Sequence, residues 1–280
     1  MKIVGGAAQL AHDCGSAAPG VAHHFDDSAA YERFMGAWSR AAGEVFLQWL
    51  APPQDARWLD VGCGTGVFTR LILDASSPAE VFAVDPEAAQ IDHASREITG
   101  TRASFRVADG CALPFAESMF DIVASALVIN FIPDRPRAIS EMRRVARPGG
   151  LIAGYVWDFA AEVSPSGPLR RALQQIGFEV PPVPGGRDSS LDRLHSLFEQ
   201  AGLESIATRS IEVMVPFPDF ETFWRAQTPS YSPTTKMIAA MTAPERERLI
   251  EAVRTALPIT ATGQIQYVAR ANAIKASTPK

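Results

Sequence analysis

The chain lacks the cysteine patterns that indicate disulfide bonds or bound zinc. Its 280 residues include only three cysteines, Cys14, Cys63 and Cys111, which lie far apart and form no Cys-x-x-Cys pair. An odd number of scattered cysteines provides neither a disulfide framework nor the paired ligands of a metal site. We therefore predict that the protein holds no metal and works in the reducing cytoplasm.

Long apolar runs and an excess of basic charge are also missing. No apolar segment reaches the roughly 20 residues that a membrane-spanning helix needs. Residues 1–20 lack the charged start and the continuous apolar core of a signal peptide. The formal net charge is −5, whereas a protein that binds nucleic acid through its phosphates needs a basic face. These absences predict a protein without a membrane span or a nucleic-acid partner.

The apolar content is sufficient for a folded domain. Hydrophobic residues make up 47% of the chain, enough for a sizeable core, and this length suits a single domain that mixes helices and strands. Residues 1–28 differ, because they are rich in Ala, Gly and Ser, and no acids or cysteines are arranged with their histidines as metal ligands. We predict a flexible arm over 1–28 and one domain over 29–280, with its core at 55–158.

The most informative stretch is a glycine-rich turn between a predicted strand and a predicted helix. Residues 58–61 form a short apolar run that includes Asp60, and Gly62, Gly64 and Gly66 follow at alternate positions. Strand, glycine turn and helix is the layout that presents backbone N–H groups to a ligand, and glycine leaves room for that ligand. The spacing is G-x-G-x-G, one residue shorter than the dinucleotide fingerprint G-x-G-x-x-G.

Two further acids follow predicted strands. Asp85 lies about twenty residues beyond the glycines, the distance at which a strand–helix–strand unit brings a carboxylate to two ribose hydroxyls. The alternative is that Asp85 caps a helix over 86–98, with proline at its first position. Asp109 takes the corresponding place after the strand predicted over 103–108, although Asp109-Gly110 alone indicates only a turn.

These residues resemble the class I S-adenosylmethionine (SAM)-dependent methyltransferases, type-11, ubiquinone/menaquinone-biosynthesis-like group. The resemblance covers about residues 31–158 and includes Leu-Asp-Val-Gly-Cys-Gly-Thr-Gly at 59–66, Phe-Asp-Ile-Val at 120–123 and Arg-Pro-Gly-Gly at 147–150. It implies an α/β fold, a Rossmann-like, doubly wound sheet of seven strands. The sheet would be mostly parallel with the last strand antiparallel, and a helical insert at about 219–256 would precede that strand as a cap over the substrate.

The resemblance also implies which residues bind SAM and its product S-adenosylhomocysteine (SAH). The glycine turn and Asp60 would hold the methionine part, Asp85 the ribose and Asp109 the adenine. Tyr31 and Arg40 would lie over the cofactor, with Arg40 facing its carboxylate; plain helix packing or a surface salt bridge is the alternative. The predicted cofactor-binding residues are Tyr31, Arg40, Asp60, Gly62, Cys63, Gly64, Thr65, Gly66, Asp85, Pro86, Asp109, Gly110, Cys111, Ser125 and Ala126.

The implied chemistry is an in-line displacement at the methyl carbon of SAM. Such a reaction needs alignment and exclusion of water more than a catalytic dyad, so no catalytic residue is predicted. The chain lacks the Asn/Asp-Pro-Pro-Tyr/Phe loop of relatives that methylate bases or glutamine, which favours a small-molecule acceptor. The candidates for the substrate wall are Asn130, Tyr155, Trp157 and Trp224.

Later segments allow only an outline of structure. A helix predicted over 134–146 carries Arg137, Arg143 and Arg144, which indicate a solvated face or compensation of the helix dipole. Asp188 or Ser189 is predicted to cap a helix that ends near Gly202. A strand is predicted over 203–217 and the last strand over 264–274.

The sequence thus predicts a SAM-dependent methyltransferase of a small molecule, working as a monomer or a homodimer. A module that binds SAM or SAH without transferring a methyl group is one alternative. An open, aromatic-lined cavity beside the cofactor would favour the enzyme, and a plugged one would favour the module. An NAD-dependent oxidoreductase is disfavoured by the glycine spacing. A protein or nucleic-acid methyltransferase would be a variant of the same chemistry.

Overall fold

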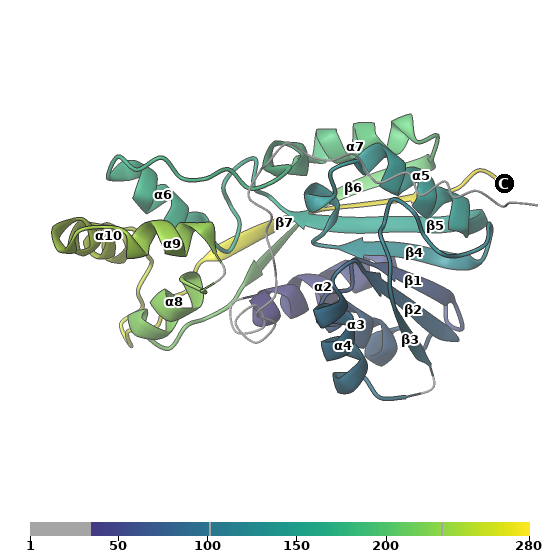
Figure 1. Cartoon of the computed structure of the whole chain (residues 1–280), viewed down its shortest axis with the longest axis horizontal. Coiled ribbons are helices and arrows are strands. Elements are labelled where there is room, and N and C mark those ends of the chain that lie inside the picture. The colour runs from purple at the N-terminus through teal and green to yellow at the C-terminus, as the bar shows by residue number, and fades with distance from the viewer. Residues whose placement is uncertain (1–34, 101, 231) are drawn as a thin grey trace, which may run out of the picture.

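The computed structural model describes residues 35–100, 102–230 and 232–280; the arm predicted over 1–28 and Tyr31 lie outside these residues. Its centre is a seven-stranded sheet with the order β3-β2-β1-β4-β5-β7-β6 (Figure 1). Only β7 runs antiparallel to its neighbours. This topology confirms the predicted fold. The strands are β1 (Arg57–Val61), β2 (Glu80–Asp85), β3 (Ala103–Val107), β4 (Phe120–Ala126), β5 (Ala146–Trp157), β6 (Glu204–Met214) and β7 (Val268–Ser277).

Helices cover both faces of this sheet. On one face lie α2 (Ala37–Leu50), α3 (Val67–Ala75) and α4 (Ala88–Glu97), and on the other lie α5 (Arg135–Val145) and α7 (Leu191–Gln200) (Figure 1). Successive residues of a strand point to opposite faces, so the fully buried Trp58 and Leu59 of β1 belong to different core clusters. Burial on both faces explains the continuous apolar run in the sequence.

A helical insert precedes β7, as predicted. It contains α8 (Phe220–Gln227), α9 (Pro233–Ala239) and α10 (Ala243–Ala256), which gather with α6 (Gly167–Gln175) at one end of the molecule (Figure 1). Buried hydrogen bonds connect these parts. Gln227 Nε2 donates to Tyr267 Oη at 2.9 Å, and both Gln227 Nε2 and Tyr267 Oη donate to the Pro165 carbonyl, at 3.0 and 2.7 Å. The Tyr267 ring also lies 5.0 Å from Trp38 of α2, so the insert packs against the sheet domain.

Several predicted boundaries were wrong. Helix α4 begins at Ala88, after Pro86, and α7 is capped by Ser190, whose hydroxyl accepts from the Arg193 N–H. Strand β6 ends at Met214 and β7 begins only at Val268. Between these ends, Ile265 forms isolated bridges with Phe217 and Ile259. Ile265 is therefore paired through isolated bridges, one of them to a residue distant in the sequence, and not in a continuous strand; a local strand pattern cannot distinguish the two.

The arginines of α5 hold the loop that follows β3. Arg144 pairs with Glu141 at 2.7 Å and donates to the carbonyls of Leu113 and Phe115. Arg137 donates to the Cys111 carbonyl at 2.9 Å. Arg143 donates to the Ala201 carbonyl at 2.9 Å, so Arg137, Arg143 and Arg144 are all tied to specific backbone groups instead of forming only a solvated face. Arg137 and Arg144 fix the loop that carries Asp109.

Candidate functional site

The three glycines after β1 adopt a conformation that other residues rarely take. Their φ angles are +79° at Gly62, +52° at Gly64 and +86° at Gly66. A Cβ atom at Gly62 would lie 2.5 Å from the Val128 side chain, so this position is closed by packing. A Cβ at Gly64 would meet no atom within 4 Å. Gly64 therefore borders open space where a ligand can approach the backbone.

Asp85 connects this turn to the start of α4. Its Oδ2 atom accepts from the Gly64 N–H at 2.9 Å, and its Oδ1 atom accepts from the Glu87 N–H at 3.0 Å. Asp85 is not the N-cap residue of α4, because that place belongs to Glu87. Burial raises the pKa of Asp85, and the two N–H donors oppose the rise. Each carboxylate oxygen keeps a second lone pair, so Asp85 can still accept from two ligand hydroxyls.

A cavity of about 330 Å³ lies beside the turn and Asp85. We call it the larger cavity. It forms where the carboxyl ends of β1, β2 and β4 and the loop after β3 meet, the usual ligand position in such sheets. Ten residues of the predicted site line it: Gly62, Cys63, Gly64, Thr65, Asp85, Pro86, Asp109, Gly110, Ala126 and Tyr155.

Other residues of the predicted site do not line the larger cavity. Asp60 is fully buried and accepts from Thr69 Oγ1 at 2.7 Å, which ties β1 to α3. Its burial raises the pKa of Asp60 to about 7. Asn130 donates from Nδ2 to the Pro184 carbonyl at 3.1 Å, and Trp224 stacks on Phe220 within the insert. The predicted residues that line neither this cavity nor the smaller one described below are Arg40, Asp60, Gly66, Cys111, Ser125, Asn130 and Trp224.

Two residues that line the larger cavity, Ser39 and Gln90, were not predicted from the sequence. Ser39 of α2 is buried and lines the larger cavity, whereas its neighbour Arg40 is exposed. The Ser39 hydroxyl has no hydrogen-bond partner within the described parts of the chain. Gln90 of α4 lines the cavity as well. For Ser39 the signal was the helical phase, because the side chain one position away on a helix, here Arg40, points about 100° aside. No sequence motif indicated Gln90.

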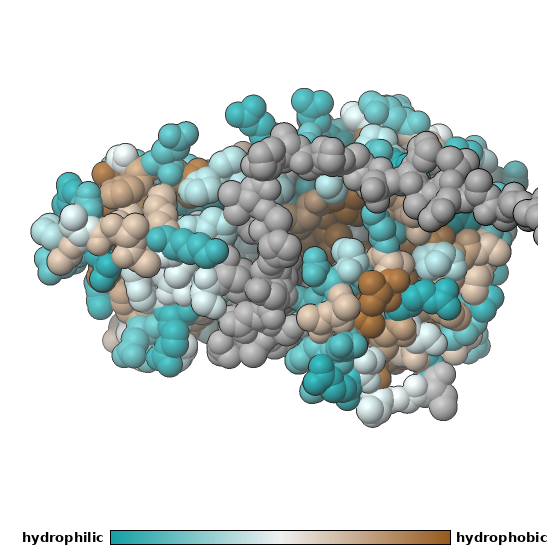
Figure 2. All heavy atoms as spheres, in the orientation of Figure 1, coloured by the Kyte–Doolittle hydropathy of each residue, from teal (hydrophilic) through white to brown (hydrophobic). Residues whose placement is uncertain are grey.

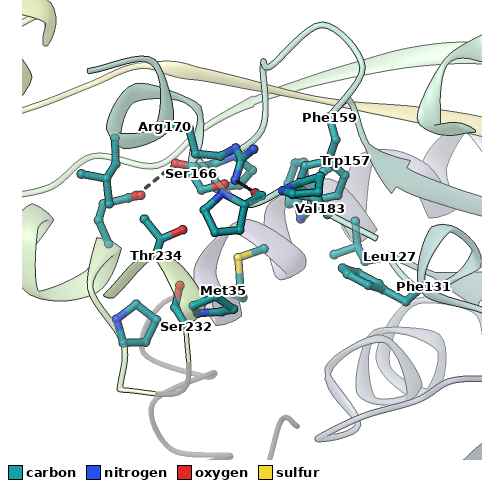
Figure 3. Close-up of a pocket in the computed structure, with 17 residues that line it drawn as sticks. Met35, Leu127, Phe131, Trp157, Phe159, Ser166, Arg170, Val183, Ser232 and Thr234 are labelled. Carbon is teal, nitrogen blue, oxygen red and sulfur yellow. Dashed lines mark hydrogen bonds between the residues drawn. The ribbon is translucent and has the colours of Figure 1, made fainter. Parts of the chain in front are cut away.

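A second cavity, of about 140 Å³, adjoins the first; we call it the smaller cavity. Leu127 and Phe131, which follow β4, line both cavities. In the space-filling view, apolar atoms line a hollow between the insert and the sheet (Figure 2). The close-up shows Trp157 and Phe159 facing the smaller cavity from the end of β5, opposite side chains from the segment before α9 (Figure 3). Trp157, a predicted substrate-wall residue, thus lines this cavity.

Comparison with known proteins decides the family. A family model described as a methyltransferase domain matches residues 59–154. The ubiquinone/menaquinone biosynthesis C-methyltransferase UbiE of Paracoccus denitrificans is 32% identical over 173 residues, covering 59% of this chain and 68% of that protein. The chain belongs to the SAM-dependent methyltransferase family.

Other comparisons match this chain to part of the length of its relatives. The biotin biosynthesis bifunctional protein BioHC of Cellvibrio japonicus is 33% identical over 193 residues, 67% of this chain and 36% of that protein. The chain spans between 36% and 63% of the length of the first four curated relatives that it matches. The solved phosphoethanolamine N-methyltransferase 2 of Haemonchus contortus, in complex with SAM, has a TM-score of 0.58 at 19% identity and covers 93% of this chain and 59% of its own. At that identity the likeness shows the fold alone.

The larger cavity has three features that suit SAM, the cofactor of this family. Gly64 leaves open space beside backbone N–H groups at the start of α3, Asp85 keeps lone pairs for ribose hydroxyls, and the Ser39 hydroxyl lacks a partner in the described chain. No group of three or more His, Cys, Asp or Glu residues is placed to hold a metal ion in residues 35–100, 102–230 and 232–280. In the same ranges, no helix has both the length and the apolar character needed to cross a bilayer.

Proposed function

We propose that the protein binds SAM in the larger cavity and transfers its methyl group to a small molecule in the smaller one. The observation that carries this proposal is that the two cavities meet at Leu127 and Phe131. A nucleophilic atom in the smaller cavity would face a methyl group presented from the larger one. Such alignment of the two reacting centres is the main protein contribution to this kind of reaction.

Each element around the larger cavity has an expected role. Asp85 accepts from the ribose hydroxyls, the turn from Gly62 to Gly66 presents its backbone to the methionine part, and Asp109 with Gly110 lies against the adenine. Tyr31 and Arg40 stay predictions as further contacts. When bound, SAM supplies an electrophilic methyl group on its sulfonium. Leu127 and Phe131 are both apolar and exclude water from the junction where the reaction would occur.

The acceptor must be nucleophilic without help from a general base of the smaller cavity. Among the described residues that line the smaller cavity there is no Asp, Glu, His, Lys, Cys or Tyr side chain that can serve as a general base. The acceptor atom is therefore expected to be reactive in its bound form, as an ionised oxygen or sulfur, a neutral amine or a stabilised carbanion. This is consistent with a reaction driven by positioning and by the cofactor.

An open smaller cavity favours transfer over mere binding of the cofactor. A module that only binds SAM or SAH has no need for an acceptor space. In this chain the space beside the larger cavity is lined by Phe131, Trp157 and Phe159 and has a volume of about 140 Å³. The presence of this acceptor space supports methyl transfer over cofactor binding alone.

The test is incubation with SAM that carries a labelled methyl group, together with a panel of acids, amines, thiols and phenols. We expect label in at least one acceptor with the wild type and with Asp92→Ala, an exposed acid on α4. Transfer should be lost with Asp85→Ala. Tight SAM binding without transfer to any member of the panel would instead support the binding module.

A further inference from the structure

The smaller cavity is lined by a single cationic side chain among the described residues. Arg170 of α6 is partly buried, and its Nη1 atom donates to the Pro181 carbonyl at 2.9 Å. No carboxylate of the described chain lies within 4.0 Å of its guanidinium. Because the guanidinium has five N–H donors and stays charged, most of its binding capacity is unused. Figure 3 shows it at the edge of the cavity, on the side of Ser166 and Trp157.

The electrostatic surroundings of Arg170 leave its charge only partly compensated. Burial lowers the pKa of Arg170, and Glu162 opposes this from a distance too long for an ion pair. The Glu162 carboxylate instead accepts from Gln174 Nε2 at 3.2 Å. A partly buried cation beside apolar side chains is unfavourable without a partner. The arrangement is therefore incomplete without an anion in the cavity.

Two further polar atoms in the cavity lining lack partners. Trp157 Nε1 and Gln227 Oε1 are both buried, with 3% of each residue exposed, and neither atom has a hydrogen-bond partner within the described ranges. Buried polar groups in folded proteins are almost always paired. Both atoms are enclosed by the protein, so Arg170 is the charged group of the lining from which an anionic oxygen in the cavity can accept.

The remaining wall is apolar and limits the size of the ligand. Phe131, Phe159, Leu169 and Met35 contribute hydrocarbon or aromatic surface. The volume of about 140 Å³ is less than half that of the larger cavity. An apolar cavity of about 150 Å³ is enough to bind one benzene ring. A single aromatic ring therefore fills this space, with a short acidic group at its edge beside Arg170.

We infer that the smaller cavity binds an aromatic acid, a one-ring compound whose carboxylate or phosphate pairs with Arg170. The identification of this ligand as the methyl acceptor rests on the proposed function, whereas its binding does not. Arg170 would then select acidic acceptors from uncharged ones of the same shape, because a guanidinium without a carboxylate partner gains an ion pair only from an anion.

The test is calorimetric titration of the full chain, with and without SAH, using 3-phenylpropionate, phenyl phosphate and the uncharged 3-phenylpropionamide. We expect at least one anionic probe to bind ten-fold or more tightly than the amide. Arg170→Gln should remove this preference, and Arg170→Lys should retain part of it. The matched control is Arg171→Gln, which changes an exposed arginine of the same helix that does not line the cavity.

Titration of each variant with SAH separates this inference from the proposed function. Unchanged SAH binding shows that the variants are folded. If SAH binds but no anionic probe binds better than the amide, or if Arg170→Gln keeps the preference, the inference is wrong and the proposed function stands. If SAH fails to bind the wild type, the proposed function fails, and the titrations without SAH still decide the inference. Binding of only one anionic probe identifies the group as carboxylate or phosphate.

Discussion

Asp85 is the last residue of β2 and Asp60 the last but one of the neighbouring β1, yet their surroundings differ. Asp85 accepts two backbone N–H groups and lines the larger cavity. Asp60 is fully buried, accepts only from Thr69, and its Oδ1 atom has no partner among the described residues. The cost of ionising a carboxyl group in the interior is therefore greater at Asp60, whose pKa is raised to about 7.

This pKa predicts a pH dependence of stability. The folded state holds the Asp60 proton more tightly than the unfolded state, so the resulting stability is present below about pH 4 and is lost as pH rises through about 7. Asp60→Asn removes this pH-dependent contribution to stability, because the asparagine side chain does not titrate. Between pH 5 and 8, the free energy of unfolding of the wild type should fall by about 2 kcal/mol relative to that of the variant. Urea unfolding at several pH values measures the difference.

The matched control for Asp60 is Asp74→Asn, an exposed acid on α3. Its free energy of unfolding should follow that of the wild type at every pH. Parallel curves for the wild type and Asp60→Asn would show that Asp60 is ionised in the folded protein throughout this range, contrary to our reading of its burial.

At the scale of elements, Gly62 and Gly64 of the turn between β1 and α3 exclude a side chain for different reasons, packing at Gly62 and ligand space at Gly64. We expect Gly62→Ala to lower the free energy of unfolding by roughly 2–4 kcal/mol, because the positive φ and the overlap with Val128 both disfavour a Cβ. Gly64→Ala should cost only about 1–2 kcal/mol, from its positive φ. Its added methyl group would stand in ligand space, so SAH affinity should fall at least ten-fold.

Urea unfolding and SAH titration of both variants separate the two effects. If Gly62→Ala proved as stable as Gly64→Ala, the close packing of the turn against Val128 would be refuted. If Gly64→Ala bound SAH as tightly as the wild type, the cofactor could not lie against this turn.

The elements that the sequence predicted well are those with local signals. The strand, glycine turn and helix at 57–75 follow from residues that are adjacent in the chain. The start of β7 was misjudged because Ile265 bridges to distant Phe217, which no local pattern reveals. Arg170 and Gln227, which line the smaller cavity together, lie 57 positions apart in the sequence. Only the folded chain shows that they share a cavity. Likewise, only the position of each side chain around α2 shows that Ser39 lines the larger cavity and Arg40 does not.

At the scale of the whole molecule, the insert and the sheet domain together line the smaller cavity, which adjoins the larger one. A ligand that binds only this folded arrangement stabilises the entire domain. SAH at about 100 times its dissociation constant should add about 2.7 kcal/mol to the free energy of unfolding. For a domain of this size, that is a rise in melting temperature of about 5 °C or more.

A thermal melt with SAH and a parallel one with NAD⁺ measure this effect. The glycine spacing predicts stabilisation by SAH and none by NAD⁺. A shift with NAD⁺ alone would revive the oxidoreductase alternative.

The most direct test of the account is calorimetric titration of the wild type with SAM and with SAH. We predict that both bind, that Asp85→Ala weakens binding at least ten-fold, and that Asp92→Ala leaves it unchanged. Because Asp85→Ala also frees two backbone N–H groups, a melt of this variant and of Asp85→Asn must first show that they fold. Absence of binding to the folded wild type, or full binding by folded Asp85→Ala, would contradict the proposed cofactor site.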